Sequence, residues 1–254
     1  MAAKKRFTIL SGPSCVGKGP LVAALDHFHP DIKYAQIPVI KSRESRPKGP
    51  RPEEVGAWNN PDFFRSSQEL LELSGNPQFL VGDCRGLPQA VDLDKVNKEN
   101  AQLLFVEIYH TIGAQLVTSA FLRHRDVDIA TVFVSPLGSD EIQDLRRAGV
   151  DVPLYLEQIM LHKQLVRARH QGMAIAGDAR GRAADASSEL KTAIAYSHVI
   201  VNHDGEGNPN WHRLASGAFT HEPEGDAGRA VLALVHILGG FAVTEAENWN
   251  GFTF

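Results

Sequence analysis

The stretch "ILSGPSCVGKGPL", residues 9–21, contains two glycines and a lysine at the spacing of a loop that binds phosphate groups. Gly12, Gly17 and Lys18 satisfy the pattern G-x-x-x-x-G-K. In such a loop the glycines let successive main-chain N–H groups converge on an anion, and the lysine reaches the terminal phosphates of a nucleotide. The residues that we assign to this loop are Gly12, Pro13, Ser14, Cys15, Val16, Gly17, Lys18 and Gly19.

The flanking sequence predicts the strand and the helix that this loop requires. Residues 7–10, "FTIL", form a short apolar run before a Ser-Gly-Pro turn, which predicts a buried strand. Residues 20–28, "PLVAALDHF", begin with a proline, which the first turn of a helix tolerates, and carry apolar residues at helical spacing. The N-terminus of that helix would add positive partial charge, so we predict a phosphate site at 12–18.

One hydroxyl group is missing from the loop. In phosphate-loop enzymes the residue after the lysine often offers an oxygen to Mg²⁺, whereas this chain has Gly19 followed by Pro20. Binding could rest on the main-chain amides and Lys18, with magnesium held through water. The loop therefore supports nucleotide binding more strongly than catalysis, and we assign no side chain as a direct metal ligand.

Alternating strands and helices predict an α/β fold with a mostly parallel central sheet flanked by helices. Further core strands are expected in the apolar, β-rich runs at 101–109, 128–135 and 198–202. Helices are expected at 62–73, 138–147, 184–195 and about 226–238. We interpret the proline- and arginine-rich segment 36–62 as a loop or short strands. The polar, arginine-rich segment from 149 to about 185 is interpreted as a mobile lid or a helical insertion.

The composition is that of an ordinary globular protein. Of the 254 residues, 43% are hydrophobic and 22% are charged, which is enough apolar material for a large core. No apolar run reaches the roughly 20 residues of a membrane span, and two cysteines are too few for a disulfide framework. We therefore expect a cytoplasmic protein without membrane contact. The formal charge of −4 gives no general attraction to nucleic acid, so the expected partner is a small molecule.

Six segments in the same order resemble one family, the guanylate kinases. Beside residues 9–21 they are "KSRESRP…RPEEVG" (41–56), "GDCRGLPQAV" (82–91), "LLFVEIYHTIGAQLV" (103–117), "FVSPLGSDEIQDLRRAG" (133–149) and "RAADASSELKTAIAYSHVIVN" (182–202). The resemblance implies a P-loop kinase fold in one domain that uses ATP and Mg²⁺. It further implies a core made of 1–35, 101–148 and 183–254, an acceptor-binding subdomain at 36–100, and a lid at 149–182.

The resemblance also implies roles for individual residues. Lys18 falls on the group that holds the donor phosphates, and Arg182 falls on the lid arginine that stabilises the transferred phosphoryl group. Glu107 falls on a carboxylate that could orient Mg²⁺ through water or accept a proton. Arg146 and Asn202 fall on positions beside the adenine or the phosphates of ATP. The acceptor would be held by residues that include two arginines, whose planar side chains match phosphate oxygens. These acceptor-site residues are Ser42, Arg46, Arg51, Glu54 and Tyr109.

Three positions depart from the family pattern in the part of the site that reads guanine. Leu87 stands where the family has a hydroxyl, Val81 where it has an acidic residue, and Tyr109 where it has an aspartate. A site that loses hydrogen-bonding partners for a base loses discrimination between bases. We therefore expect the phosphate-binding half of the acceptor pocket to persist and strict guanine specificity to be lost.

Three functions remain open from the sequence. The first is ATP-dependent phosphoryl transfer to a nucleoside monophosphate, with GMP as the acceptor that the resemblance implies. The second is a binding or regulatory module that has lost turnover, and the third is a kinase for another phosphorylated small molecule or modified nucleotide. The C-terminal "ENWNGFTF" has three aromatic residues, and it could pack on its own chain, on a second copy or on a protein partner.

Overall fold

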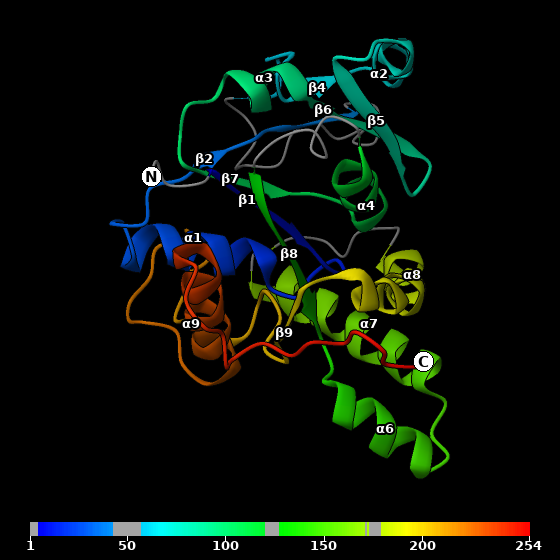
Figure 1. Ribbon diagram of the computed structural model, residues 1–254. Helices are drawn as coiled ribbons and strands as arrows, with labels where there is room; N and C mark the ends of the chain where they lie inside the picture. The colour runs from blue at the N-terminus through cyan, green and yellow to red at the C-terminus, as the bar shows by residue number, and fades with distance from the viewer. Residues whose placement is uncertain (1–4, 43–56, 120–126, 171, 173–178) are drawn as a thin grey trace. The chain divides into compact units, whose positions relative to one another are not determined.

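The computed structural model describes residues 5–42, 57–119, 127–170, 172 and 179–254 (Figure 1). In this part of the chain the strands form two sheets. One has five strands in the order β2-β7-β1-β8-β9, and the other has four in the order β4-β3-β6-β5. In the five-stranded sheet, β2 pairs with β7 and β8 pairs with β9, and both pairs are parallel. The predicted α/β fold with a parallel sheet and flanking helices is confirmed.

The chain divides into two units by its internal contacts. Unit 1 comprises Met1–Ile9 and Tyr34–Ile129, and unit 2 comprises Leu10–Lys33 and Ala130–Phe254. Strands β1 (Lys5–Ser11) and β8 (Val127–Ser135) contribute residues to both units. The division into core, acceptor-binding subdomain and lid stays a prediction.

Unit 1 holds the four-stranded sheet and its helices. β5 and β6 form a hairpin whose two-residue turn, Arg85-Gly86, has φ angles of 57° and 79°, as the type I′ turns of tight hairpins require. The strands of this unit are β2 (Ala35–Gln36), β3 (Val39–Ser42), β4 (Phe64–Arg65), β5 (Phe79–Cys84), β6 (Leu87–Asp92) and β7 (Leu103–Glu107). Its helices are α2 (Ser67–Glu72), η2 (Leu73–Gly75), α3 (Leu93–Lys98) and α4 (His110–Thr118).

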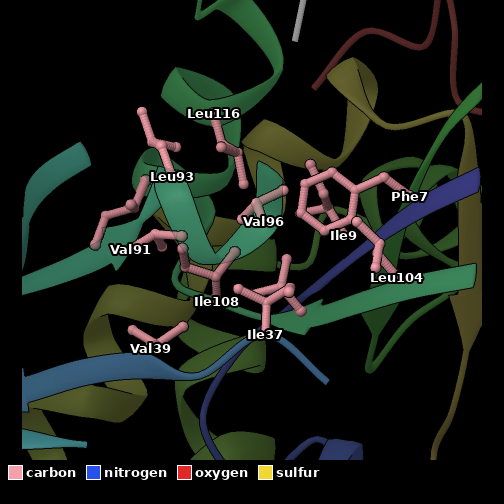
Figure 2. Close-up of a cluster of buried hydrophobic side chains, with 12 residues drawn as sticks. Phe7, Ile9, Ile37, Val39, Val91, Leu93, Val96, Leu104, Ile108 and Leu116 are labelled. Atoms are coloured by element: carbon pink, nitrogen blue, oxygen red, sulfur yellow. The ribbon is translucent and has the colours of Figure 1, made fainter. Parts of the chain in front are cut away.

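The core of unit 1 is a cluster of twelve buried apolar side chains (Figure 2). They come from the strands β1, β3, β6 and β7, from the helices α3 and α4, and from the chain just before β3 and just after β7. Their alternation along the strands places one face of each strand in the cluster. The members are Phe7, Ile9, Ile37, Val39, Val91, Leu93, Val96, Leu104, Val106, Ile108, Ile112 and Leu116.

Unit 2 holds β9 (His198–Val201) and most of the helices. Helix α1 (Lys18–Phe28) packs against α9 (Gly225–Gly239), and the two lie side by side in Figure 1. Helix α7 (Val152–His170) packs against α8 (Ala179–Lys191). The remaining elements are α6 (Ser139–Arg147), η3 (Thr192–Ala195) and η4 (Pro209–Trp211). No helix among the described residues is long and apolar enough to cross a membrane.

The aromatic C-terminal segment packs on its own chain. Glu247 forms an antiparallel bridge with Val199 of β9, and its carboxylate accepts a hydrogen bond from the main-chain N–H of Ser139 over 2.9 Å. Trp249 is only 1% exposed and its ring lies 5.3 Å from that of Phe252, centroid to centroid. Of the alternatives left open by the sequence, the structure shows packing within the chain.

Candidate functional site

The loop between β1 and α1 has the main-chain shape of an anion-binding site. Gly12, Cys15 and Gly17 all have positive φ angles, of 143°, 69° and 108°. A Cβ at Gly12 would lie 2.5 Å from the carbonyl oxygen of Val134, so only glycine fits there. Gly17 caps α1 without a side-chain hydrogen bond, which leaves the first N–H groups of the helix to a ligand.

Lys18 closes the loop on itself. Its Nζ donates hydrogen bonds to the carbonyl oxygens of Gly12, over 2.6 Å, and Pro13, over 2.8 Å. An ammonium group has three donors, so one remains for a phosphate oxygen. The side chain therefore fixes the loop and keeps a positive charge beside it.

A buried layer of side chains supports the loop from behind. Asn202 is fully buried, and its Nδ2 donates to the carbonyl oxygen of Val16 over 2.7 Å. Trp211 is 1% exposed and donates from Nε1 to the carbonyl oxygen of Gly205 over 2.5 Å. The main-chain N–H of Glu206 donates to the carbonyl oxygen of Cys15 over 3.2 Å. The segment after β9 thus makes two hydrogen bonds to the loop, from Asn202 and Glu206, and Trp211 holds that segment in place through Gly205.

Two cations of α7 lie on the same side of the loop. The Nζ of Lys163 donates to the carbonyl oxygen of His203, and burial lowers the pKa of Lys163 to about 8, against the opposing effect of Asp204. Arg167 pairs with Glu206 over 2.8 Å and places its Nη1 3.4 Å from the Sγ of Cys15. The loop and its surroundings in unit 2 therefore combine main-chain donors with positive charge.

A second cluster of polar groups lies in unit 1 where β7 ends and α4 begins. Glu107 is the exposed last residue of β7, and Tyr109 caps α4. The guanidinium carbon of Arg85 lies 5.2 Å from the centre of the Tyr109 ring, a cation–π arrangement. His110 is 8% exposed, and its pKa is lowered by burial and by the charge of Arg85. The positive charge of Arg85 thus lies close to Tyr109, which stands where the family pattern has an aspartate.

No family model matches the chain. The chain is 28% identical over 207 residues to a guanylate kinase from Synechococcus sp. (strain JA-3-3Ab), which covers 79% of this chain and 77% of that protein. It is 29% identical over 152 residues to one from Nostoc sp. (58% and 68%), and 29% over 162 residues to one from Streptomyces kasugaensis (61% and 71%). The chain is thus similar, over 79% of its length in the first of these comparisons, to proteins named guanylate kinase.

A solved guanylate kinase from Anaplasma phagocytophilum covers 80% of this chain and 80% of its own, with 18% identity and a TM-score of 0.45.

Two residues expected near the ATP of a guanylate kinase make other contacts in the structure. Asn202, expected beside the adenine, is buried beneath the loop and bonded to Val16. Arg146 is exposed on α6 and donates from Nη1 to the carbonyl oxygen of Thr253 over 2.8 Å. Arg182 lies on α8 and is partly exposed. The structure therefore gives Asn202 a supporting position and Arg146 a contact with the C-terminal segment.

The expected acceptor residues are only partly described. Ser42 ends β3, is 3% exposed, and its Oγ lies 2.6 Å from the Oγ of Ser67. Arg46, Arg51 and Glu54 lie outside the described residues.

The two substituted positions on the β5–β6 hairpin, 81 and 87, carry apolar side chains. Val81 packs against the buried cluster of Ile40, Leu70 and Ala90, and Leu87 pairs with Cys84 next to the turn. A carboxylate in place of Val81 would be desolvated against that cluster, which is unfavourable. The structure therefore explains why an apolar side chain suits position 81.

Sequence reasoning missed Lys163, Arg167 and Glu206. The two cations are four residues apart, which places them on one face of a helix, and that spacing was the available signal. Their approach to the loop depends on how α7 packs, because Gly207 lies so close to α7 that a Cβ there would be 2.9 Å from the Cα of Arg167.

Proposed function

We propose that the chain transfers the terminal phosphoryl group of ATP to a nucleoside monophosphate. The observation that carries the proposal is the loop at 12–18, with three positive φ angles and Lys18 folded across it. The relatives named guanylate kinase support a kinase-type enzyme over a purely structural module.

Catalysis of phosphoryl transfer is mostly positioning and charge neutralisation. Lys18 and the main-chain N–H groups of the loop would hold the donor phosphates, and Arg182 would meet the charge that develops on the transferred group. Glu107, exposed at the end of β7, would accept the acceptor's proton or orient a magnesium-bound water.

Magnesium would supply charge neutralisation on the phosphates. Among the described residues there is no group of three or more His, Cys, Asp or Glu side chains that could hold a metal ion, and the loop has Gly19 in place of a hydroxyl. Mg²⁺ commonly keeps several waters and binds through phosphates and one or two carboxylates. The residues thus fit an ion that arrives with ATP.

The acceptor would be held by its phosphate more than by its base. Arg46, Arg51 and Ser42 would bind the monophosphate, whereas Val81 and Leu87 offer a base no hydrogen bond. Losing such partners removes discrimination that a paired site provides. GMP is therefore proposed as one acceptor among several purine monophosphates.

A binding module without turnover is the second candidate, because Gly19 and Pro20 supply no hydroxyl for magnesium. An ADP-release assay with Mg·ATP and a panel of nucleoside monophosphates and sugar phosphates separates the two. Turnover that is lost in Lys18→Ala and Arg182→Ala supports the enzyme. ATP binding by calorimetry without turnover on any acceptor supports the module.

Two matched variants control for the loss of a positive charge. Lys98 is 79% exposed and pairs with Asp94, and Arg229 is 66% exposed and pairs with Asp226. Lys98→Ala and Arg229→Ala should keep wild-type turnover. If they lose activity as Lys18→Ala and Arg182→Ala do, the effect is a general one of charge or folding.

A further inference from the structure

Helix α7 holds the backbone of Arg167 in a fixed position beside the loop at 12–18. The backbone of α7 lies against Gly207, and Lys163, one turn earlier and 6% exposed, is bonded to the carbonyl oxygen of His203. The Nη1 of Arg167 lies 3.4 Å from the Sγ of Cys15, in the middle of the loop. Because the helix is tightly packed, the side chain of Arg167 is the part that can rearrange.

The charge of Arg167 is balanced by Glu206. The Nε of Arg167 and the Oε2 of Glu206 are 2.8 Å apart, and each side chain is 17% exposed. The other carboxylate oxygen of Glu206 lies 3.5 Å from the position that a Cβ would take at Gly19. Gly19 is the second residue of α1, so the carboxylate lies beside the first turn of that helix.

That first turn is where a bound phosphate is most favoured. It contains no acidic residue of its own, and Gly17 provides no side-chain cap. The unsatisfied N–H groups and the helix dipole attract an anion to this place. Glu206 therefore supplies a negative charge close to the place where a nucleotide would bring its own.

We propose that Glu206 is an internal counter-ion of the loop, and that Arg167 exchanges it for a phosphate oxygen of the bound donor nucleotide. The inference rests on the proposed function, because it assumes that the loop binds ATP. The guanidinium group suits this exchange, since its planar set of donors matches a carboxylate and a phosphate equally well. Because the phosphate carries more negative charge than the carboxylate, the guanidinium group of Arg167 pairs with the phosphate when the nucleotide is bound.

The proposal predicts opposite effects for the two partners of one ion pair. Arg167→Gln removes a contact to phosphate, and a charge-assisted hydrogen bond of this kind corresponds to a loss of roughly 10- to 100-fold in ATP affinity. Glu206→Gln removes a competing and repelling negative charge, so ATP should bind about 3- to 10-fold more tightly. A pair that only stabilises the fold would lower affinity, or leave it unchanged, in both variants.

Isothermal titration calorimetry of the full chain with ATP, ADP and AMP tests the proposal. The variants are Arg167→Gln, Arg167→Lys, Glu206→Gln and the control Arg229→Gln, each checked by thermal unfolding. We expect the loss in Arg167→Gln to be largest for ATP and smallest for AMP, with partial rescue in Arg167→Lys. Because Glu206→Gln keeps the size of the side chain, it tests the proposal even where Arg167→Gln fails to fold.

The outcomes distinguish a failure of the counter-ion proposal from a failure of the proposed nucleotide binding. If wild type binds ATP and Lys18→Ala does not, but Glu206→Gln binds ATP no more tightly than wild type, the counter-ion proposal is overturned while the nucleotide site stands. Equal losses for ATP and AMP in Arg167→Gln would overturn it too. A wild-type chain that binds no ATP would overturn both.

Discussion

Asn202 donates a hydrogen bond from Nδ2 to the carbonyl oxygen of Val16 over 2.7 Å and so ties the end of β9 to the phosphate-binding loop. The main-chain N–H of Asn202 donates to Ser135, at the end of β8, over 2.8 Å. The shape of the loop therefore depends on two strands that are more than a hundred residues away in the sequence. We therefore expect stability and nucleotide binding to be coupled through this one side chain.

Replacing Asn202 with leucine should affect both properties. Asn202→Leu leaves the buried carbonyl of Val16 without its donor, which costs about 1–3 kcal/mol in the free energy of unfolding. The loop then loses its fixed shape, and ATP affinity should fall at least about tenfold. Urea unfolding and ATP calorimetry measure the two effects, with the exposed Asn250→Ala as control. An Asn202 variant with wild-type stability and affinity would contradict the coupling.

Gly17 should tolerate no side chain. Its φ angle is 108°, and a Cβ there would lie 2.3 Å from the Nδ2 of Asn202. Gly17→Ala should therefore lose more than the roughly 1–2 kcal/mol that left-handed backbone alone costs, and should lose ATP binding. Gly251→Ala is the matched control, because Gly251 has a φ angle of 84° with no atom within 4 Å of the added Cβ.

Denaturant unfolding and calorimetry compare the two glycine variants. Gly251→Ala should lose only the backbone contribution and keep ATP affinity. If the two variants lose equal stability and both bind ATP, the close approach of Asn202 to the loop has no energetic consequence.

The strands and the loop of this chain could be predicted because their signals are local. The apolar runs at 7–10 and 128–135 lie within β1 and β8, and the run at 198–202 extends one residue beyond β9. The helix expected at 20–28 begins two residues earlier, at Lys18. Apolar runs that are buried on both faces need no knowledge of their neighbours.

The β5–β6 hairpin and the cations of α7 could not be predicted in this way. The hairpin contains Gly82 and Pro88, residues that weaken a strand pattern, and its turn is Arg85-Gly86 rather than a common turn pair. Arg167 looks like any exposed arginine of a polar helix until α7 is packed against the loop. Long-range packing, which is absent from local patterns, decides the surroundings of these residues.

Trp249 should anchor the C-terminal segment. The side chain is 1% exposed and donates from Nε1 to the carboxylate of Glu247, which bridges to β9 and α6. Trp249→Ala should cost about 3–5 kcal/mol in the free energy of unfolding, as truncation of a buried tryptophan does. Phe241, 67% exposed, is the control, and Phe241→Ala should change stability by less than about 1 kcal/mol. Equal, small effects in urea unfolding would show that the segment contributes little.

Lys163 should make stability rise with pH in alkaline solution. Its pKa is about 8 in the folded chain because of burial, against 10.5 for an ordinary lysine. Between these values the unfolded chain binds more protons than the folded chain, so raising the pH favours folding. Each unit of difference corresponds to about 1.4 kcal/mol, so the gain between pH 8 and 10.5 is on the order of 3 kcal/mol. Below pH 8 Lys163 is protonated in both the folded and the unfolded chain, so it does not change the free energy of unfolding with pH.

Urea unfolding of wild type and Lys163→Met from pH 7 to 10 isolates the effect, because all other titrating groups are shared. A difference between the two free energies that stays constant over this range would show that Lys163 keeps an ordinary pKa.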